Sequence, residues 1–314
     1  MMAANVSAAG GLARLCAFTL TTPDPAATAQ AYCRSLDYVV AGEGSISVDL
    51  ARLWGHPALA GRRSMLLHAS QSPDTLLRLI EAPALPATPV ALPGHGWNAM
   101  EVLVRDPYSL VAELQGSPFK LLIPPRPLPF DAAIHAMQVE GPAGELLYLT
   151  ALPADRTIMG LHAAQSRVDR PFIAILGCAD LAAVLAFHAR VLGTETIGAA
   201  PTIVKIINDS FGLPDQHRIP LGIVKMARDS LIEVDQLPAA ARLRPSASGE
   251  LPVGFALVSF ECADLASFDV RWLQAPRALS GLPYRGRRAG LLRGAAGELI
   301  ELIESSQERP MEPA

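Results

Sequence analysis

Two short sequence motifs each occur twice, far apart in the chain, and this internal repetition constrains the fold more than any other feature. CADLA at residues 178–182 returns at 262–266, and GPAGELLYL at 141–149 is closely matched by GAAGELIEL at 294–302. The first motif ends an apolar strand pattern and begins a helix, and the second is a Gly-containing turn before an apolar strand. The chain is therefore predicted to consist of repeated units that begin and end with a strand.

Four such units can be laid out along the chain. The opening strands are placed at Ala17, Ala99, Ile173 and Leu257. Seven residues further on, every unit has an aspartate, at Asp24, Asp106, Asp180 and Asp264. A carboxylate in this place is predicted to cap the first turn of a helix. Helices are expected over 26–36, 108–116, 181–192 and 265–273, and closing strands over 76–81, 146–149, 231–235 and 299–304.

The chain has 314 residues, which is a comfortable length for two domains. The segment from 153 to 170 mixes polar and apolar residues without a strand pattern, so it is predicted to join two halves. We therefore predict an N-terminal domain over 1–156 and a C-terminal domain over 157–314, with two units in each.

Composition excludes several classes of partner. A net charge of -4 with 18% charged residues gives no basic footprint for nucleic acid. No apolar run reaches the roughly 18 residues that a membrane-spanning helix needs. The four cysteines are far apart and form no CxxC pair, which predicts a cytoplasmic, reducing location. Gly-rich phosphate loops, Rossmann fingerprints and GxSxG elbows are absent from the sequence, so nucleotide cofactors are not expected.

Two phrases resemble the vicinal-oxygen-chelate superfamily, which contains glyoxalase, bleomycin-resistance and extradiol-dioxygenase proteins. FHARVLG at 187–193 is similar to the F-Y-x-x-x-L-G phrase that closes the first helix of its modules, and residues 32–36 are a weaker copy. GAAGELIE at 294–301 resembles the D-P-x-G-x-x-I-E phrase, whose Glu binds metal in that family. The resemblance covers roughly residues 14 to 304. It implies an α+β fold of four βαβββ modules that form two cup-shaped, mixed-sheet domains.

The same resemblance implies metal ligands on the first and last strands of each module. The first-strand positions carried over are Ala17, Ala99, Ile173 and Leu257, none of which can coordinate a cation. The last-strand positions are Arg78, Tyr148, Glu233 and Glu301. An extradiol dioxygenase needs two His and one carboxylate, so this set disfavours iron. No metal cofactor is expected, and the alternative is a divalent Fe, Mn or Zn ion held by Glu301 and Glu233 with His217 or His135.

Strand alternation places Glu301 and Glu233 on the apolar faces of their strands. If units three and four pair about a pseudo-twofold axis, as modules of the family do, these two carboxylates face each other in one cup. Desolvation and mutual repulsion would raise at least one pKa toward neutrality, so both are predicted to be catalytic acid/base groups. Alternatively they are solvated or paired with Arg242 or Arg293, and the spacing of charges over 298–304 also fits a helix.

Further residues are candidates for substrate binding because they share these strand faces or lie near a cup mouth. They are His217, Asp235, Glu261, Tyr148, Arg78 and Trp97. Glu101 lies on the same strand face as Ala99 and could also enter a cavity. For Trp97 and Tyr148, packing in the core is the competing interpretation.

Three functions are consistent with these features. The favoured one is a metal-independent isomerase, epimerase or lyase that acts on a small, mostly apolar, oxygenated metabolite, aromatic compounds included. The second is a non-catalytic protein that binds and sequesters a small molecule, as bleomycin-resistance proteins do. The third is an extradiol-dioxygenase-like or glyoxalase-like metalloenzyme with an atypical ligand set. The expected partner is a small molecule, and a homodimer is compatible with the sequence.

Overall fold

The computed structural model of the chain describes residues 11–83, 93–198 and 200–305 and contains four consecutive modules. The first is built from β1 (Leu12–Thr22), α1 (Pro25–Ser35), β2 (Tyr38–Ser45), β3 (Arg63–Ala69) and β4 (Ser72–Glu81). The second is built from β5 (Gly96–Val104), α3 (Pro107–Leu114), β6 (Lys120–Leu128), β7 (Asp131–Glu140) and β8 (Leu146–Ala151).

The third module is built from β9 (Val168–Cys178), α4 (Leu181–Arg190), β10 (Glu195–Gly198), β11 (Leu221–Lys225) and β12 (Leu231–Gln236). The fourth is built from β13 (Gly254–Cys262), the 3-10 turn η2 (Leu265–Ser267), β14 (Gln274–Ala278), β15 (Arg288–Arg293) and β16 (Leu299–Glu304). The predicted repeat is confirmed. Residues 299–304 form a strand, so the competing helical interpretation of this segment is wrong.

The four aspartates cap their segments as predicted, because each side chain accepts a hydrogen bond from a backbone N–H of the following turn. The predicted helix over 265–273 is wrong, since only Leu265–Ser267 is helical and Phe268 has an extended backbone. Phe268, Val270 and Trp272 all pack on the core, and this spacing of two suits an extended chain rather than a helix. Three further short helices lie inside modules: α2 (Val48–Leu53), η1 (Pro57–Leu59) and α5 (Lys205–Phe211).

The strands form two eight-stranded sheets, and their order corrects the predicted pairing of modules. One sheet runs β14-β15-β16-β13-β1-β4-β3-β2, and the other runs β10-β11-β12-β9-β5-β8-β7-β6. The first module therefore pairs with the fourth, through antiparallel β1 and β13, and the second pairs with the third, through β5 and β9. A division into 1–156 and 157–314 does not follow the sheets, because each sheet takes one module from either side of it.

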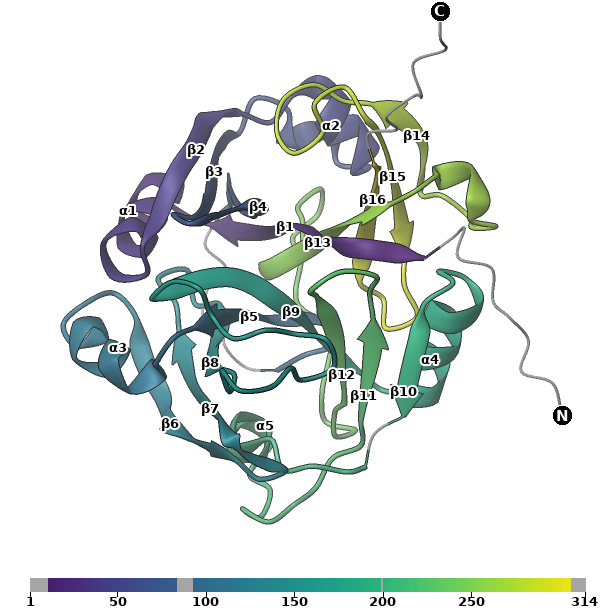
Figure 1. Cartoon of the computed structure of the whole chain (residues 1–314). Helices are drawn as coiled ribbons and strands as arrows, with labels where there is room; N and C mark the ends of the chain where they lie inside the picture. Colours follow the sequence, from purple (N-terminus) through teal and green to yellow (C-terminus); the bar gives the residue numbers. More distant parts are fainter. Residues whose placement is uncertain (1–10, 84–92, 199, 306–314) are drawn as a thin grey trace, which may run out of the picture.

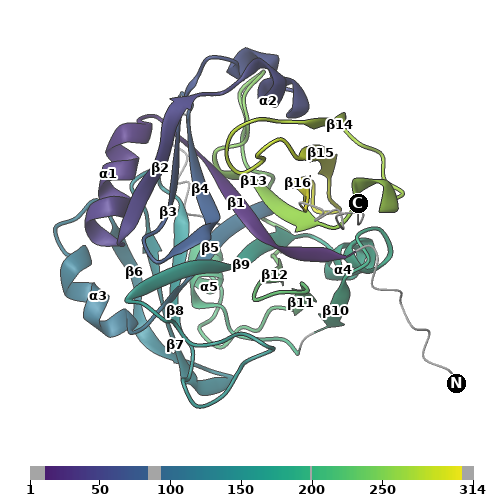
Figure 2. The same ribbon diagram turned by 45° about the horizontal axis from the view of Figure 1, so that its top comes forward.

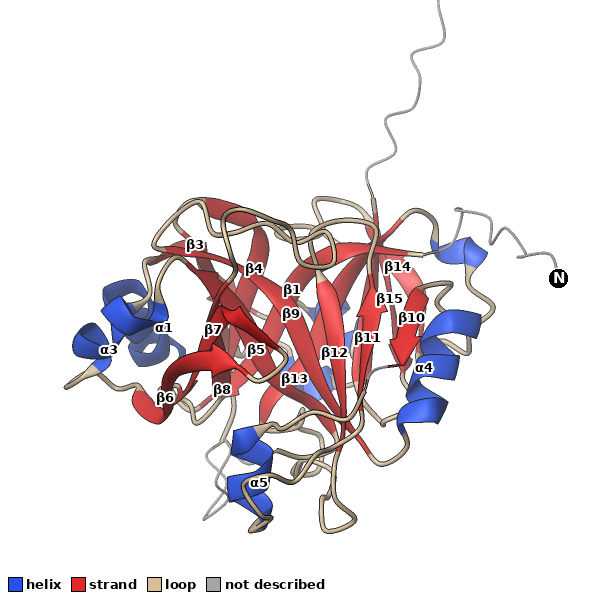
Figure 3. Ribbon diagram, turned by 60° about the horizontal axis from the view of Figure 1, so that its bottom comes forward, coloured by secondary structure: helices blue, strands red, loops and turns tan. Residues whose placement is uncertain are grey.

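The two sheets pack back to back, as the two layers of Figure 1 show. The core between them draws apolar side chains from both sheets, including Phe18, Val258 and Phe260 from one and Trp97 and Met100 from the other. The helices lie at the ends and outside of the strands (Figure 3), with α1 and α3 together at one end and α4 at the other. On each strand, every second side chain points into this core, so the side chains between them point to the outer face of the sheet.

Each sheet has an outer face partly covered by a short helix. We call the outer face of the β1-containing sheet the first cup and that of the β5-containing sheet the second cup. Helix α2 packs on the first cup beside β14 (Figure 2), where Trp54 and Leu53 join its apolar cluster. Helix α5 packs on the second cup through Ile206 and Ile207. Among the described residues, no helix is both long and apolar enough to cross a membrane.

Candidate functional site

Three acidic groups and a tyrosine meet in the second cup. Glu101 on β5 stands opposite Tyr148 on β8, and Glu233 on β12 stands opposite Ile175 on β9. Asp235 follows Glu233 by two residues, so both side chains point to the same face of β12. The sheet thus brings residues that are far apart in the sequence into one acidic group on an apolar surface.

A cavity of about 70 Å³ opens over this group and has Glu101, Glu233 and Tyr148 in its lining. Its apolar lining includes Ile123, Val204 and Leu221. Two cationic residues, Arg126 and Lys205, and the exposed Phe130 also border it. At roughly 10–15 Å³ for each water-sized group, the space admits about five such groups, which is the size of a small reacting fragment.

The low polarity of the second cup changes the acidity of its carboxyl groups. Burial, followed by the negative charge of Glu233, raises the pKa of Glu101 to about 8. Burial raises the pKa of Glu233 to about 7. Burial and the charges of Glu233 and Glu101 raise the pKa of Asp235 well above its usual range. The pair Glu101 and Glu233 therefore exchanges a proton with solvent near neutral pH, where one member can be an acid while the other is a base.

Asp235 is 1% exposed, and neither of its carboxyl oxygens has a hydrogen-bond partner among the described residues. An unpaired carboxylate in such a place is costly, which agrees with its raised pKa and favours the neutral acid. In that form it adds a buried proton donor beside Glu233 without adding charge.

The first cup has a different centre, in which Glu301 is fully buried. Its Oε2 lies 4.0 Å from Nη1 of Arg78 and accepts a 2.6 Å hydrogen bond from the Ser259 hydroxyl. Its Oε1 accepts hydrogen bonds of 2.9 Å from Trp54 Nε1 and 2.9 Å from the Tyr284 hydroxyl. Both Glu301 and Arg78 are almost inaccessible, at 0% and 2% exposed.

Arg78 is held as firmly as its carboxylate partner. It donates to the Thr19 hydroxyl at 3.3 Å and to the Tyr284 hydroxyl at 3.0 Å. Its guanidinium group also lies over the ring of Trp54, 5.1 Å from the ring centroid. Glu301 accepts three hydrogen bonds and forms one ion pair, all with buried residues of the first cup. It is therefore a structural ion-pair partner and not a free base. Neither Arg242 nor Arg293, the partners considered from the sequence, takes this role, because both donate to backbone carbonyls.

The predicted meeting of Glu233 and Glu301 is therefore wrong, since they lie on different sheets whose cups face opposite ways. The reason is the pairing of modules one with four and two with three. Glu233 instead has Glu101 as its acidic partner. The sequence predicts Glu101 only as a residue that could enter a cavity, although it is the single charged residue of the mostly apolar strand β5, which is a sequence signal for a functional role.

The other candidates divide between the two cups and elsewhere. Tyr148 and Asp235 belong to the second cup, while Arg78 and Glu261 belong to the first. Trp97 is a core residue and is not available to bind a substrate, because it is 2% exposed between the sheets and its Nε1 donates to the Leu299 carbonyl at 2.8 Å.

Neither histidine considered as a ligand reaches the acidic group. His217 is exposed in the loop between α5 and β11. His135 faces away from the cavity, because its neighbours Ala136 and Gln138 line that cavity and strand residues alternate. Its Nδ1 is 3.0 Å from the Tyr108 hydroxyl. The alternative ligand set of Glu301, Glu233 and either histidine is therefore wrong.

Comparison with solved structures agrees with this architecture over nearly the whole chain. Glyoxalase I from Zea mays superposes with a TM-score of 0.62 at 13% sequence identity, covering 93% of this chain and 92% of that chain. A candidate dioxygenase from Bacillus subtilis subsp. subtilis str. 168 superposes with a TM-score of 0.62 at 12% identity, covering 95% of this chain and 87% of that chain.

The chain has the vicinal-oxygen-chelate fold. Sequence identity of 12–13% establishes the fold and leaves the activity open. No protein-family model and no curated protein matches the sequence.

The donor groups present do not fit the metal that the vicinal-oxygen-chelate fold commonly holds. The residues that face Arg78, Tyr148, Glu233 and Glu301 across the strands are Thr19, Glu101, Ile175 and Ser259. They lie two residues beyond the first-strand positions taken from the sequence. In the first cup the Arg78 guanidinium stands beside Glu301, and a second cation there would be repelled. In residues 11–83, 93–198 and 200–305, no three His, Cys, Asp or Glu side chains are arranged to share a metal ion.

Proposed function

We propose that this chain is an enzyme whose second cup catalyses proton transfer on a small, mostly apolar, oxygenated metabolite without a metal ion. The supporting observation is the Glu101 and Glu233 pair, with pKa values raised to about 8 and about 7 beside one small cavity. A general acid and a general base are most effective when their pKa values lie near the working pH.

The proposed step uses the two carboxyl groups in opposite roles. Glu233, as the carboxylate, removes a proton from the carbon next to a carbonyl group, and the electron pair of the broken C–H bond forms the C=C bond of an enol. Glu101, as the acid, gives its proton to the carbonyl oxygen. Glu233 then gives its proton to another carbon, or to the other face of the same carbon, while an O–H group of the enol returns a proton to Glu101 as a C=O bond forms. This completes an isomerisation or epimerisation and regenerates both groups.

The walls of the cavity support this choice of substrate. Ile123, Val204 and Leu221 favour an apolar body, while the hydroxyl of Tyr148 can hydrogen-bond a substrate oxygen. Burial and the acidic neighbours raise the pKa of Tyr148 well above its usual range, so it stays a neutral donor. The guanidinium group of Arg126 in the cavity lining favours a substrate with partial negative charge there, whereas Lys205 is already ion-paired with Asp209 and Asp215.

The test is hydrogen exchange at carbon. Small hydroxyketones with aliphatic or phenyl substituents are incubated with the protein in D₂O, and loss of the proton next to the carbonyl is followed by NMR. We expect catalysed exchange for part of this panel, with a bell-shaped dependence on pH and an optimum between about 7 and 8, where Glu233 is ionised and Glu101 is protonated.

The matched variants are Glu233→Gln, Glu101→Gln and the control Glu195→Gln. Glu195 is an exposed carboxylate on β10 of the same sheet, ion-paired with Lys225. Exchange should be lost in the first two variants and kept in the control, with all three folded by circular dichroism. The proposal fails if the wild-type protein exchanges no member of the panel, or if Glu233→Gln exchanges as fast as wild type.

Binding without chemistry is the second candidate function, and the first cup favours it. Two cavities of about 350 and 280 Å³ open there, and the larger one falls within the size range of small-molecule sites. The central carboxylate of this cup, Glu301, is fully occupied by Arg78 and its other partners. A ligand in the first cup would therefore meet no free base at its centre.

A further inference from the structure

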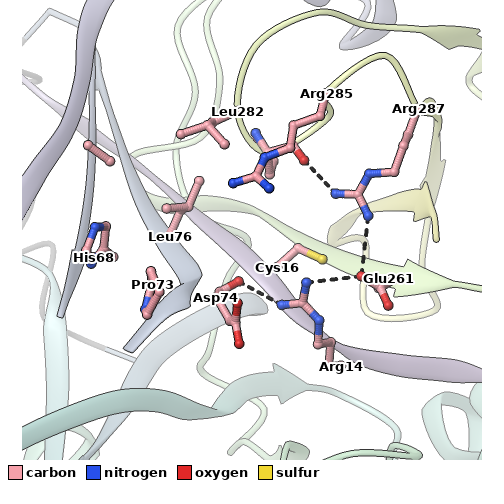
Figure 4. Close-up of a pocket in the computed structure, with 12 residues that line it drawn as sticks. Arg14, Cys16, His68, Pro73, Asp74, Leu76, Glu261, Leu282, Arg285 and Arg287 are labelled. Atoms are coloured by element: carbon pink, nitrogen blue, oxygen red, sulfur yellow. Dashed lines mark hydrogen bonds and ion pairs between the residues drawn. The ribbon is translucent and has the colours of Figure 1, made fainter. Parts of the chain in front are cut away.

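One cavity of the first cup is bordered by an unusual number of arginines. It has a volume of about 350 Å³ and lies between the start of β1, the start of β4 and the loop before β15. Arg14, Arg285 and Arg287 stand around it, as Figure 4 shows. Its apolar lining includes Leu76 and Leu282.

Three guanidinium groups converge on the single carboxylate of Glu261, which is 5% exposed. Arg14 and Arg228 form ion pairs with it at 3.0 and 2.7 Å, and Arg287 approaches to 3.4 Å. One carboxylate cannot neutralise three guanidinium groups. Glu261 therefore acts as a positioning group that holds the arginines together at the edge of the cavity, and a positive charge is left over.

Arg285 adds a fourth positive charge and is not engaged with Glu261. Its guanidinium has no ion pair or hydrogen bond with any described residue, and its side chain reaches toward the cavity from the loop (Figure 4). Its backbone φ is 52°, a left-handed conformation that residues other than glycine adopt at a cost. An exposed cation held by a strained turn beside a cavity is available to a ligand.

The charge balance of the cavity is positive. Arg14, Arg285 and Arg287 line the cavity together with the carboxylates of Glu261 and Asp74, an excess of one positive charge. Arg228 lies outside the lining and pairs with Glu261, which raises the excess around the cavity to two. Cys16 adds no negative charge, because burial raises the pKa of its thiol to about 12. From this geometry we infer that the cavity binds a small organic dianion, a phosphate monoester, whose phosphate meets Arg285 with Arg14 and Arg287 and whose apolar body lies on Leu76 and Leu282.

A phosphate monoester fits both parts of the cavity. Its second pKa is about 6, so it carries close to two negative charges at neutral pH, matching the excess. Its three terminal oxygens can accept hydrogen bonds from guanidinium groups that approach from different walls, and such charge-assisted bonds are strong. This site lies on the other sheet from Glu101 and Glu233, so it is independent of the proposed proton transfer.

Isothermal titration calorimetry of the full chain at pH 7.5 tests the inference with phenyl phosphate, benzoate and benzyl alcohol. These probes share an apolar ring and carry a dianionic, a monoanionic and a neutral group. We expect phenyl phosphate to bind at one site and at least about tenfold more tightly than benzoate, with benzyl alcohol weakest and with affinity falling as salt is raised.

The deciding variant is Arg285→Gln, which removes an exposed charge and is not expected to disturb folding. It should weaken phenyl phosphate about tenfold or more, the effect of losing one charge-assisted hydrogen bond. Arg288→Gln is the matched control, since Arg288 is an exposed neighbour on β15 paired with Glu304 and lies outside the cavity lining. Equal affinity of Arg285→Gln and wild type, or phenyl phosphate binding no better than benzyl alcohol, would overturn the inference.

Discussion

Replacing Glu101 with Gln should remove a pH-dependent loss of stability. The pKa of Glu101 is raised from 4.5 to about 8 in the folded chain, because burial and Glu233 disfavour its charged form. The folded state therefore holds this proton more tightly than the unfolded state does. The stabilisation that this bound proton gives to the folded state is therefore complete below pH 4.5 and is lost as the pH rises through about 8.

The magnitude follows from the size of the shift. A change of about 3.5 pKa units at 1.36 kcal/mol each sets a ceiling of about 5 kcal/mol on the stability lost to ionisation of Glu101. Glu233 and Asp235 titrate together with it and share that cost, so we expect about 3 kcal/mol between pH 5 and 9. Gln resembles the neutral acid in shape and has no proton to lose.

Urea unfolding at pH 5, 7 and 9 measures the effect. Wild type and Glu101→Gln should have similar free energies of unfolding at pH 5, and the variant should be the more stable protein at pH 9. The control Glu195→Gln should follow the wild-type pH dependence. Parallel pH profiles for wild type and Glu101→Gln would refute the idea that Glu101 is a buried group with a raised pKa.

Two further predictions concern the ion pair of the first cup and the absence of a metal requirement. Arg78→Met should lower the free energy of unfolding in urea by about 3–5 kcal/mol, because Glu301 would be left buried without its cation. The double variant Arg78→Met with Glu301→Leu should recover most of that loss, and a single variant as stable as wild type would contradict the role assigned to the pair. Dialysis against EDTA should leave the melting temperature and the carbon-exchange activity unchanged. Stoichiometric, tightly held Fe, Mn or Zn in the purified protein would overturn the metal-free proposal.

The repeat could be predicted from the sequence because its signals are local. Capping aspartates such as Asp24 and Asp180 act on the next turn of the chain, and the alternation of Leu299, Glu301 and Ile303 reports one strand at a time. The fourth helix was the exception. Over 265–273 the capping aspartate was present, but the apolar residues had the spacing of an extended chain.

The pairing of modules could not be predicted, because it depends on which opening strands meet. Strands β1 and β13 pair through Ala17 and Ser259, and β5 and β9 pair through Ala99 and Ile175. All four strands are apolar and similar in length, so the sequence contains no local preference for one partner. Neighbouring modules in the chain were expected to pair, whereas the structure joins the outer two and the inner two.

For the same reason, the acidic partner of Glu233 in the candidate site could not be predicted from the sequence. Strand alternation predicts the correct face for Glu233 and Asp235, but it gives Glu301 in place of Glu101 as the acidic partner of Glu233. A shift of two residues along a strand preserves the face, so the alternating pattern could not separate Ala99 from Glu101 as the residue at the centre of the cup. The hydrogen bonds of Glu301 to Trp54 and Tyr284 likewise depend on long-range packing.

Direct titration of the two cup carboxyl groups tests the central claim. With ¹³C-labelled glutamate, the carboxyl resonances of Glu101 and Glu233, assigned by loss of a signal in each Gln variant, are followed by NMR from pH 3 to 10. Midpoints near 8 and 7 are expected, and the midpoint of the remaining group should fall when either partner is replaced by Gln. Two independent titrations near pH 4.5 would show that the second cup holds ordinary solvated carboxylates and would contradict the account.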